Sequence, residues 1–161
     1  MFEPAVYQER RSCLVERLQR AGVTSGIVLF PSNGESPINY PDNCYPFRQD
    51  SNWLYFVGLN VPDMLLVLDL SDGKSTLFAN DITMDDMIWT GPMESVADLA
   101  RKSGITDVRP LNAASGRVEV AIARREPVYC LPFYRTETKE RLSRLSGLSP
   151  RQLEESISAE L

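Results

Sequence analysis

Carboxylates, lysine, tyrosine or cysteine must do any chemistry in this 161-residue chain, because the chain contains no histidine. Without an imidazole, it cannot form a Ser/His/Asp or Cys/His nucleophile pair or a histidine-ligated metal site. The one tight carboxylate cluster is Asp81, Asp85 and Asp86. These acids could bind Mg²⁺ or Ca²⁺ through oxygen, although acids at such spacing more often complement the dipole of a short helix. The residue types therefore exclude the commonest catalytic devices.

A second polar group stands directly before an apolar run. Residues 48–52 read Arg-Gln-Asp-Ser-Asn, and residues 53–57 read Trp-Leu-Tyr-Phe-Val. The apolar run predicts a buried strand, with the polar residues at its mouth, where they must satisfy one another or a ligand. Two interpretations follow: Arg48 braces the preceding loop through a carboxylate, or the polar group binds a small molecule.

The elements that would position these residues alternate between strand and helix patterns. Strands are predicted at 26–30, 53–57, 64–70, 75–79, 107–111 and 127–131, and helices at 5–20, 83–88, 94–102, 113–125 and 136–145. The pair Asp72 and Gly73 predicts a hairpin, so part of the sheet is antiparallel. The pattern predicts an α/β fold, a mixed β-sheet with helices packed on it. The proline-rich segment 31–47 is predicted to be a long loop, and the basic residues of 135–144 a solvated helix face.

Charge and cysteine content narrow the setting of the protein. With 17 basic and 22 acidic residues, the net charge is −5, which argues against nucleic acid as a partner. No apolar run approaches the ~18 residues of a membrane span, and the N-terminus does not read as a signal peptide. We therefore expect a cytoplasmic protein without membrane contact. Cys13, Cys44 and Cys130 are widely spaced, which predicts reduced thiols that act as small buried hydrophobic residues.

At residues 45–63, the sequence resembles the N-terminal domain of Xaa-Pro aminopeptidases, in the group that includes prolidase and creatinase. The similarity includes Arg10-Arg11-x-x-Leu14-x-x-x-Leu18 and Ile88-Trp89-x-Gly91, and extends over residues 7–131. The patterns Arg-Gln-Asp-Ser-Asn and Tyr-Phe-x-Gly-Leu favour the aminopeptidases over creatinase. The resemblance implies the ribonuclease H-like α/β fold of creatinase and prolidase N-terminal domains.

The resemblance also implies that the parent enzyme hydrolyses the bond before a proline at the second position of a peptide. In the family, two divalent ions, commonly Mn²⁺, activate the attacking hydroxide, and two Asp, one His and two Glu of a catalytic domain bind them. A chain without histidine cannot supply this set, so we assign no metal ligand or catalytic residue and expect the chain alone to be inactive. We expect the family domain over residues 1–148, and at residues 149–161 the start of a linker helix to a missing catalytic domain.

The resemblance assigns accessory roles to a few residues. Trp89 matches a tryptophan that reaches a neighbouring subunit's substrate pocket, and Asp42 matches a loop aspartate near that active site. Arg48, Asp50 and Tyr55 match motif positions and are expected to be structural. Trp89 as core and Asp42 as a turn residue remain open alternatives. The expected role is to cover the active site of the catalytic domain and to build a homo-oligomer.

Two further alternatives remain at this stage. The chain could be a stand-alone module that binds a small ligand or peptide through the 31–47 loop and residues 48–52. The parent protein could also be a prolidase or creatinase relative.

Overall fold

A five-stranded mixed sheet forms the centre of the computed structural model, which describes residues 1–40, 43–81, 91, 94–149 and 151–152. The strand order is β4-β3-β2-β1-β5. The strands are β1 (Ile27–Pro31), β2 (Leu65–Asp69), β3 (Ser75–Phe78), β4 (Asp107–Arg109) and β5 (Val128–Cys130). β2 runs antiparallel to β1 and β3, whereas β5 is parallel to β1 and β4 is parallel to β3. The predicted α/β class is confirmed.

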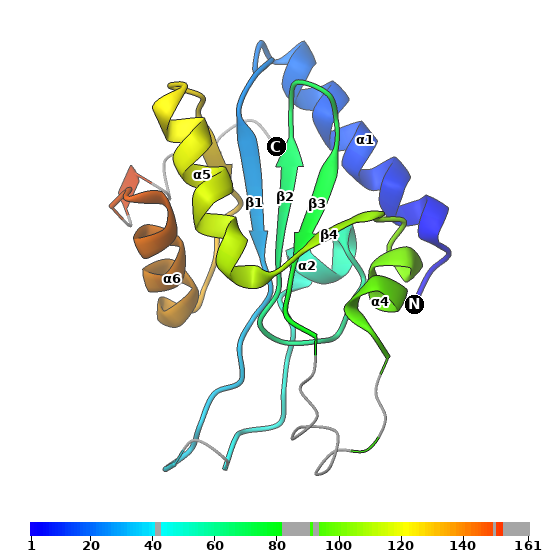
Figure 1. The fold of residues 1–161 in the computed structure, drawn as a ribbon, viewed down its shortest axis with the longest axis vertical. Coiled ribbons are helices and arrows are strands. Elements are labelled where there is room, and N and C mark those ends of the chain that lie inside the picture. The colour runs from blue at the N-terminus through cyan, green and yellow to red at the C-terminus, as the bar shows by residue number, and fades with distance from the viewer. Residues whose placement is uncertain (41–42, 82–90, 92–93, 150, 153–161) are drawn as a thin grey trace.

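Helices cover both faces of the sheet (Figure 1). One face carries α1 (Pro4–Arg20), α2 (Ser51–Phe56) and α4 (Val96–Lys102), and the other carries α5 (Ala114–Ala123) and α6 (Thr136–Ser146). A 3-10 turn, η1 (Leu111–Ala113), precedes α5. Successive side chains of a strand point to opposite faces, so Val28 and Phe30 enter the first core and Ile27 and Leu29 the second. The result is a three-layer sandwich with one core on each side of the sheet.

Most of the predicted elements are present within a few residues of their expected bounds. The hairpin between β2 and β3 is confirmed, and Gly73 takes a φ of +71° in its turn. The Gly73 amide donates to the carbonyl of Asp69 at 2.9 Å. A glycine fits here because it adopts positive φ at little cost.

The prediction of a strand at residues 53–57 is wrong, because this run belongs to helix α2. Trp53 and Val57, four residues apart, are fully buried, whereas Leu54 and Tyr55 between them are exposed. Burial therefore repeats at the spacing of a helix. The Asp50 carboxylate starts the helix by accepting the Trp53 amide at 3.0 Å. A short apolar run is compatible with either element, and here the N-cap decides.

The connection from β1 to α2 leaves the sheet as a narrow arm, which we define as residues 34–47 (Figure 1). Its two sides pair through a bridge between Pro37 and Cys44, and the Tyr45 amide donates to the Ser36 carbonyl at 2.9 Å. The predicted loop is thus confirmed as a segment without helix or extended strand among its described residues, but it has hydrogen bonds of its own. Asp42 lies outside the described residues.

The three cysteines differ in burial. Cys130 is buried in the second core, Cys44 is half-buried and Cys13 is exposed on α1. None of the three forms a disulfide in the described part of the chain. The expectation of burial is wrong for Cys13, because the apolar face of α1 is formed by Tyr7, Leu14 and Leu18 and position 13 falls beside it.

The helix predicted from residue 149 is described only at its start. The Gln152 amide donates to the Ser149 hydroxyl at 3.3 Å, and the Gln152 side-chain oxygen accepts the Ser149 amide at 2.9 Å. This reciprocal pair is a capping box, a standard helix start. The predicted helix at 83–88 lies outside the described residues.

Candidate functional site

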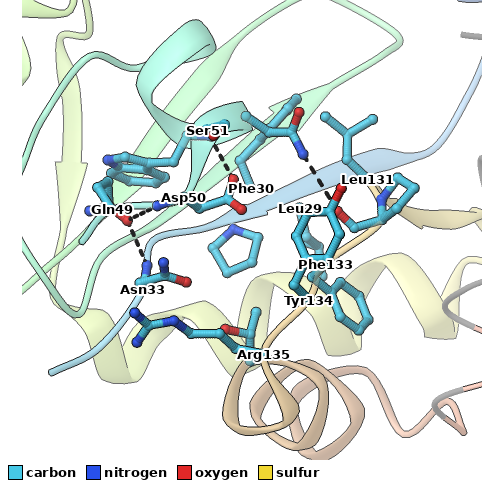
Figure 2. A pocket seen from close by; sticks show the side chains of 15 residues that line it. Leu29, Phe30, Asn33, Gln49, Asp50, Ser51, Leu131, Phe133, Tyr134 and Arg135 are labelled. Carbon is cyan, nitrogen blue, oxygen red and sulfur yellow. Dashed lines mark hydrogen bonds between the residues drawn. The ribbon is translucent and has the colours of Figure 1, made fainter. Parts of the chain in front are cut away.

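An open cavity of about 180 Å³ lies at the ends of β1 and β5 (Figure 2). These two strands are parallel neighbours, so their carboxyl ends meet at the same edge of the sheet. After β1 the chain leads to α2 on one face, whereas after β5 it leads to α6 on the other face. Such a reversal opens a crevice between the strand ends, and ligands of α/β proteins bind preferentially at this position. Its position at this edge of the sheet makes the cavity the candidate site in the described part of the chain.

The walls of the cavity combine apolar and polar residues. The apolar part comes from the end of β1, from α2 and from the segment after β5: Leu29, Phe30, Pro31, Trp53, Leu131, Pro132 and Phe133. The polar part comes from Asn33, Gln49, Asp50, Ser51, Asn52, Arg135 and Thr138. Residues 49–52, singled out from the sequence, therefore do line a cavity. Asn33 and the α6 residues Arg135 and Thr138 lack any local sequence signal, because only the fold brings them there.

Gln49 organises the polar wall. Its side-chain oxygen accepts hydrogen bonds from the amides of Asn33, at 2.7 Å, and Asp50, at 2.9 Å. Its side-chain nitrogen donates to the Val61 carbonyl at 2.9 Å. Gln49 thus joins three chain segments, and its own hydrogen-bonding groups are used. The expectation that these polar residues satisfy one another is confirmed for Gln49.

Arg48 does not brace the arm through a carboxylate, contrary to one interpretation of the sequence. Its side chain is exposed and forms no ion pair with the described residues. Its backbone carbonyl accepts a hydrogen bond from the Asn33 side chain at 2.9 Å. Arg135 holds the arm instead. Its guanidinium donates to the Gly34 carbonyl at 3.2 Å and to the Ser36 hydroxyl at 2.9 Å.

A second arginine of α6, Arg141, donates to the Met64 carbonyl at 2.7 Å, next to the start of β2. Burial lowers the pKa of Arg141, and the nearby Asp63 carboxylate, 3.7 Å away, opposes that shift. The predicted solvated basic face is therefore wrong for Arg135 and Arg141. It describes Arg144 better, because that side chain is exposed and contacts only Glu140 of the same helix among the described residues.

Arg10 and Arg11 of α1 hold the other end of α2. Arg10 donates to the Tyr55 carbonyl at 2.8 Å, and its guanidinium lies 4.1 Å from the centre of the Tyr55 ring. Arg11 donates to the Phe56 carbonyl at 2.7 Å and to the Ser103 carbonyl at 2.8 Å. Burial lowers the pKa of Arg11 to about 10. These bonds satisfy carbonyls that the end of a helix leaves open.

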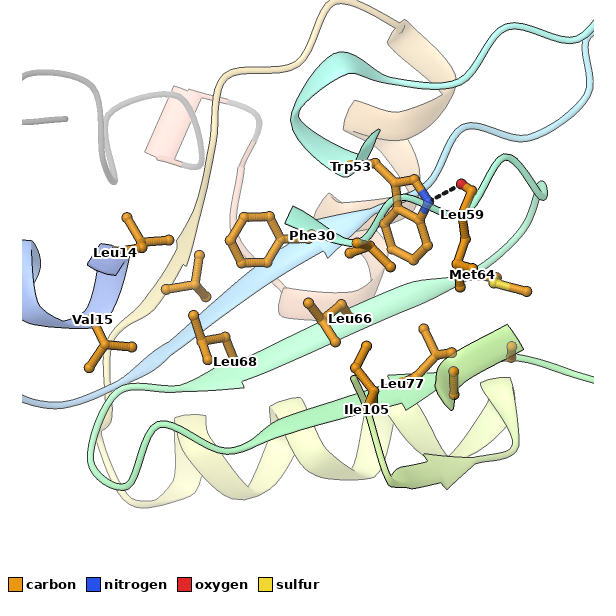
Figure 3. Packing of buried hydrophobic residues seen from close by; sticks show 14 of the residues in the cluster. Leu14, Val15, Phe30, Trp53, Leu59, Met64, Leu66, Leu68, Leu77 and Ile105 are labelled. Atoms are coloured by element: carbon orange, nitrogen blue, oxygen red, sulfur yellow. Dashed lines mark hydrogen bonds between the residues drawn. The ribbon is translucent and has the colours of Figure 1, made fainter. Parts of the chain in front are cut away.

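Trp53 anchors α2 in the first core (Figure 3). Its indole N–H donates to the Leu59 carbonyl at 2.6 Å, which satisfies the only polar atom of the side chain. Gly58 follows α2 with a φ of +77°, and a Cβ there would lie 2.1 Å from the Tyr7 ring. The motif at residues 45–63 thus reflects the close packing of α2 between α1 and the sheet.

The residues with predicted accessory roles, Trp89 and Asp42, lie outside the described residues, so their roles stay predictions. Of the acidic cluster, Asp81 accepts the Val96 amide at the start of α4, at 2.7 Å, and the other two acids lie outside the described residues. Within the described residues, no group of three or more His, Cys, Asp or Glu side chains could hold a metal ion. These donors therefore do not fit a two-metal centre. No described helix is long and apolar enough to cross a membrane.

Solved aminopeptidases share this fold. Escherichia coli aminopeptidase P in its low-pH form is 27% identical in sequence, with a TM-score of 0.62, over 74% of this chain and 27% of that one. Pseudomonas aeruginosa aminopeptidase PepP covers 89% of this chain with a TM-score of 0.72, and its 20% identity speaks for the fold alone. The molecule is therefore an α/β domain of the kind found in these enzymes.

The family model described as "Aminopeptidase P, N-terminal domain" matches residues 7–129. The chain belongs to this family. A probable Xaa-Pro aminopeptidase of Aspergillus niger is 33% identical over 106 residues, which are 65% of this chain and 22% of the relative. A probable Xaa-Pro aminopeptidase of Emericella nidulans is 27% identical over 131 residues, 80% of this chain and 28% of the relative. The chain thus spans less than a third of the length of these relatives.

Proposed function

We propose that this chain is a non-catalytic accessory domain of an Xaa-Pro aminopeptidase-like metallopeptidase, which removes N-terminal residues that precede a proline. In this role it covers the approach to the active site of a catalytic domain and contributes to a homo-oligomer. Its partners are that catalytic domain, further copies of the protein and peptides with proline at the second position. The family membership of residues 7–129 carries the proposal.

The topology of the sheet supports the role of the two predicted accessory residues. β1 and β3 are both antiparallel to β2, so both end at the same edge of the sheet. The arm that contains Asp42 follows β1, and the segment that contains Trp89 follows β3. Two segments that follow strands ending at one edge can serve one neighbouring surface. We therefore assign Asp42 and Trp89 to a single contact with the substrate pocket of a neighbouring subunit.

The metal ions of the parent enzyme belong to its catalytic domain in this proposal. We propose that they are two divalent ions, Mn²⁺, and place no ligand in this chain, since it has no histidine and its described carboxylates form no ligand cluster. Three cysteines without a disulfide among the described residues and an acidic composition support a reducing, cytoplasmic setting.

The test is the steady-state kinetics of a polypeptide that joins this domain to a family catalytic domain. Trp89→Ala should raise KM for an Xaa-Pro peptide, because an apolar face beside the proline is lost, while far-UV circular dichroism and the urea midpoint stay unchanged. Trp89→Phe keeps an aromatic face and is the matched control, with KM close to that of the parent. An unchanged KM in the folded Trp89→Ala protein would refute the pocket role, and an unfolded variant domain would identify Trp89 as a core residue.

A further inference from the structure

We propose that the cavity between β1 and β5 binds a small organic ammonium ion, a protonated amine with a compact apolar body. The inference rests on the cavity alone and is independent of the proposed role in a peptidase. Its polar wall presents side-chain oxygens as acceptors, and its other walls are apolar.

Asn33 provides an acceptor in the wall of the cavity. Its side chain is 8% exposed and lines the cavity. The amide nitrogen of the side chain donates to the Arg48 carbonyl at 2.9 Å, which fixes its orientation and leaves Oδ1 as the free end. No donor among the described residues binds this oxygen. This oxygen is open to solvent, since among the described residues only Arg117 Nη1 is a buried side-chain polar atom without a partner. A donor bound in the cavity could therefore take the place of water on it.

Asp50 provides the charge. Its Oδ1 accepts the Trp53 amide, and no lysine or arginine of the described residues forms an ion pair with the carboxylate. Figure 2 shows this carboxylate extending from α2 toward the cavity. Asn33 and Asp50 lie close together, because the amides of both residues bind the same oxygen of Gln49. Together they offer a carboxylate and an amide oxygen to one cation.

The guanidinium of Arg135 does not bind the Asp50 carboxylate. The guanidinium of Arg135 is turned away from the Asp50 carboxylate and toward Asn33 and the arm in Figure 2, where it donates to Gly34 and Ser36. An anionic ligand would meet the Asp50 carboxylate at close range. The Arg135 guanidinium also donates to the Arg48 carbonyl, at 3.4 Å, so its hydrogen bonds go to the arm and to the chain beside Asn33. The Asp50 carboxylate is thus left without an ion pair among the described residues, and it favours a cation over an anion.

The remaining walls determine the size and the apolar character of the ligand. Phe30 and Trp53 lie at the cavity but are almost completely buried, so Leu131 and Phe133, which are half-buried, supply apolar surface that a ligand can reach. The volume of about 180 Å³ is close to that of an apolar cavity of about 150 Å³ that holds benzene in another protein. A branched amine of four carbons fits this space.

The experiment is a titration of the ¹⁵N-labelled 161-residue chain at low ionic strength and pH 7, followed by two-dimensional NMR. Isobutylammonium chloride is the probe, and isobutanol and sodium isobutyrate are its neutral and anionic counterparts. We expect saturable shifts of the amides of Asn33, Trp53 and Phe133 with the ammonium probe only. No saturation with isobutylammonium, or equal binding of isobutanol or isobutyrate, would overturn the proposal.

Asp50→Asn tests the charge, because asparagine is an equally good N-cap and leaves α2 in place. The variant should weaken isobutylammonium binding about fivefold or more. Asp72→Asn, in the exposed turn between β2 and β3, removes the same charge elsewhere and should leave binding unchanged. Equal affinity of Asp50→Asn and the unmodified chain would overturn the proposal. The comparison of the three probes on the unmodified chain decides the question even if the variant is unstable.

Discussion

Two pairs of arginines bind backbone carbonyls in this domain, and they differ in what surrounds them. Arg10 and Arg11 of α1 bind the carbonyls at the end of α2, and Arg11 is buried between α1, α2 and α4. Arg135 and Arg141 of α6 bind the base of the arm and the start of β2, and both are only half-buried. Arg11 fastens elements of the core to one another, whereas Arg135 fastens the projecting arm to the core.

The comparison shows how the same interaction serves stability at one place and positioning at another. A buried guanidinium has lost its water, so its protein hydrogen bonds are hard to replace once they are removed. A half-exposed guanidinium keeps access to water, which can replace a lost partner. The four predictions below test this difference, from the largest expected effect to the smallest.

Arg11→Met should lower the free energy of unfolding by about 3 kcal/mol, because methionine fills much of the volume but leaves the Phe56 and Ser103 carbonyls without a donor. Urea unfolding of the purified chain measures this loss. Arg20→Met is the matched control, because Arg20 is exposed and pairs only with Glu16 among the described residues. A loss for Arg11→Met no larger than that of the control would contradict the role of Arg11 in the core.

Asp50→Ala should lower the free energy of unfolding by about 1 kcal/mol, the usual effect of removing an N-cap. The reason is the lost bond to the Trp53 amide at the start of α2. Asp50→Asn should retain nearly all of the stability in the same urea experiment. Equal losses for both variants would show that the carboxylate stabilises α2 by its charge and not as a cap.

Arg135→Met should change the global stability by less than about 1 kcal/mol but loosen the arm, since water can reach the released carbonyls. The readout is hydrogen exchange at the Ile38 and Tyr45 amides, which bond across the arm to Asn43 and Ser36. We expect these amides to exchange faster than in Arg144→Met, a control in the exposed face of α6. Unchanged exchange would mean that the arm holds its shape without Arg135.

A third kind of arginine contact should give the smallest effect. Burial alone would raise the pKa of Asp69, but hydrogen bonds from Ser71 and from the Arg117 guanidinium outweigh it and hold that pKa below its ordinary value. The stabilisation is therefore complete above the unfolded pKa, about 4, and is lost as the pH falls through the folded value. Urea unfolding between pH 6 and 3 should show a steeper loss for the unmodified chain than for Asp69→Asn. Equal slopes would disprove the contribution of Asp69.

The elements of the fold could largely be predicted from the sequence, because their apolar residues repeat at regular spacing. The β2–β3 hairpin and α1 follow directly from such patterns. The run that begins at Trp53 gave a wrong prediction, because five apolar residues fit a strand or a helix equally well. The hydrogen bond from the Trp53 amide to the Asp50 carboxylate, which starts the helix, decides between the two.

Only half of the candidate site could be predicted from the sequence. Residues 48–52 drew attention as polar groups before an apolar run, and Gln49 and Asp50 do line the cavity. Asn33, Arg135 and Thr138 come from distant parts of the chain, and nothing in their local sequence distinguishes them from surface residues. The sequence suggests that Arg48 holds the arm, whereas Arg135 does so in the structure. A sequence shows which residues are neighbours along the chain and not which segments meet in space.

The most direct test of the central claim, that this chain is an accessory domain without its own catalytic centre, is peptide hydrolysis by the purified 161-residue protein. The assay uses an Xaa-Pro peptide in the presence of Mn²⁺, with mass spectrometry to detect release of the first residue. The account predicts no cleavage above the level of a buffer control. A peptidase activity that cleaves before the proline, copurifies with the chain, requires Mn²⁺ and stops on chelation would contradict the account.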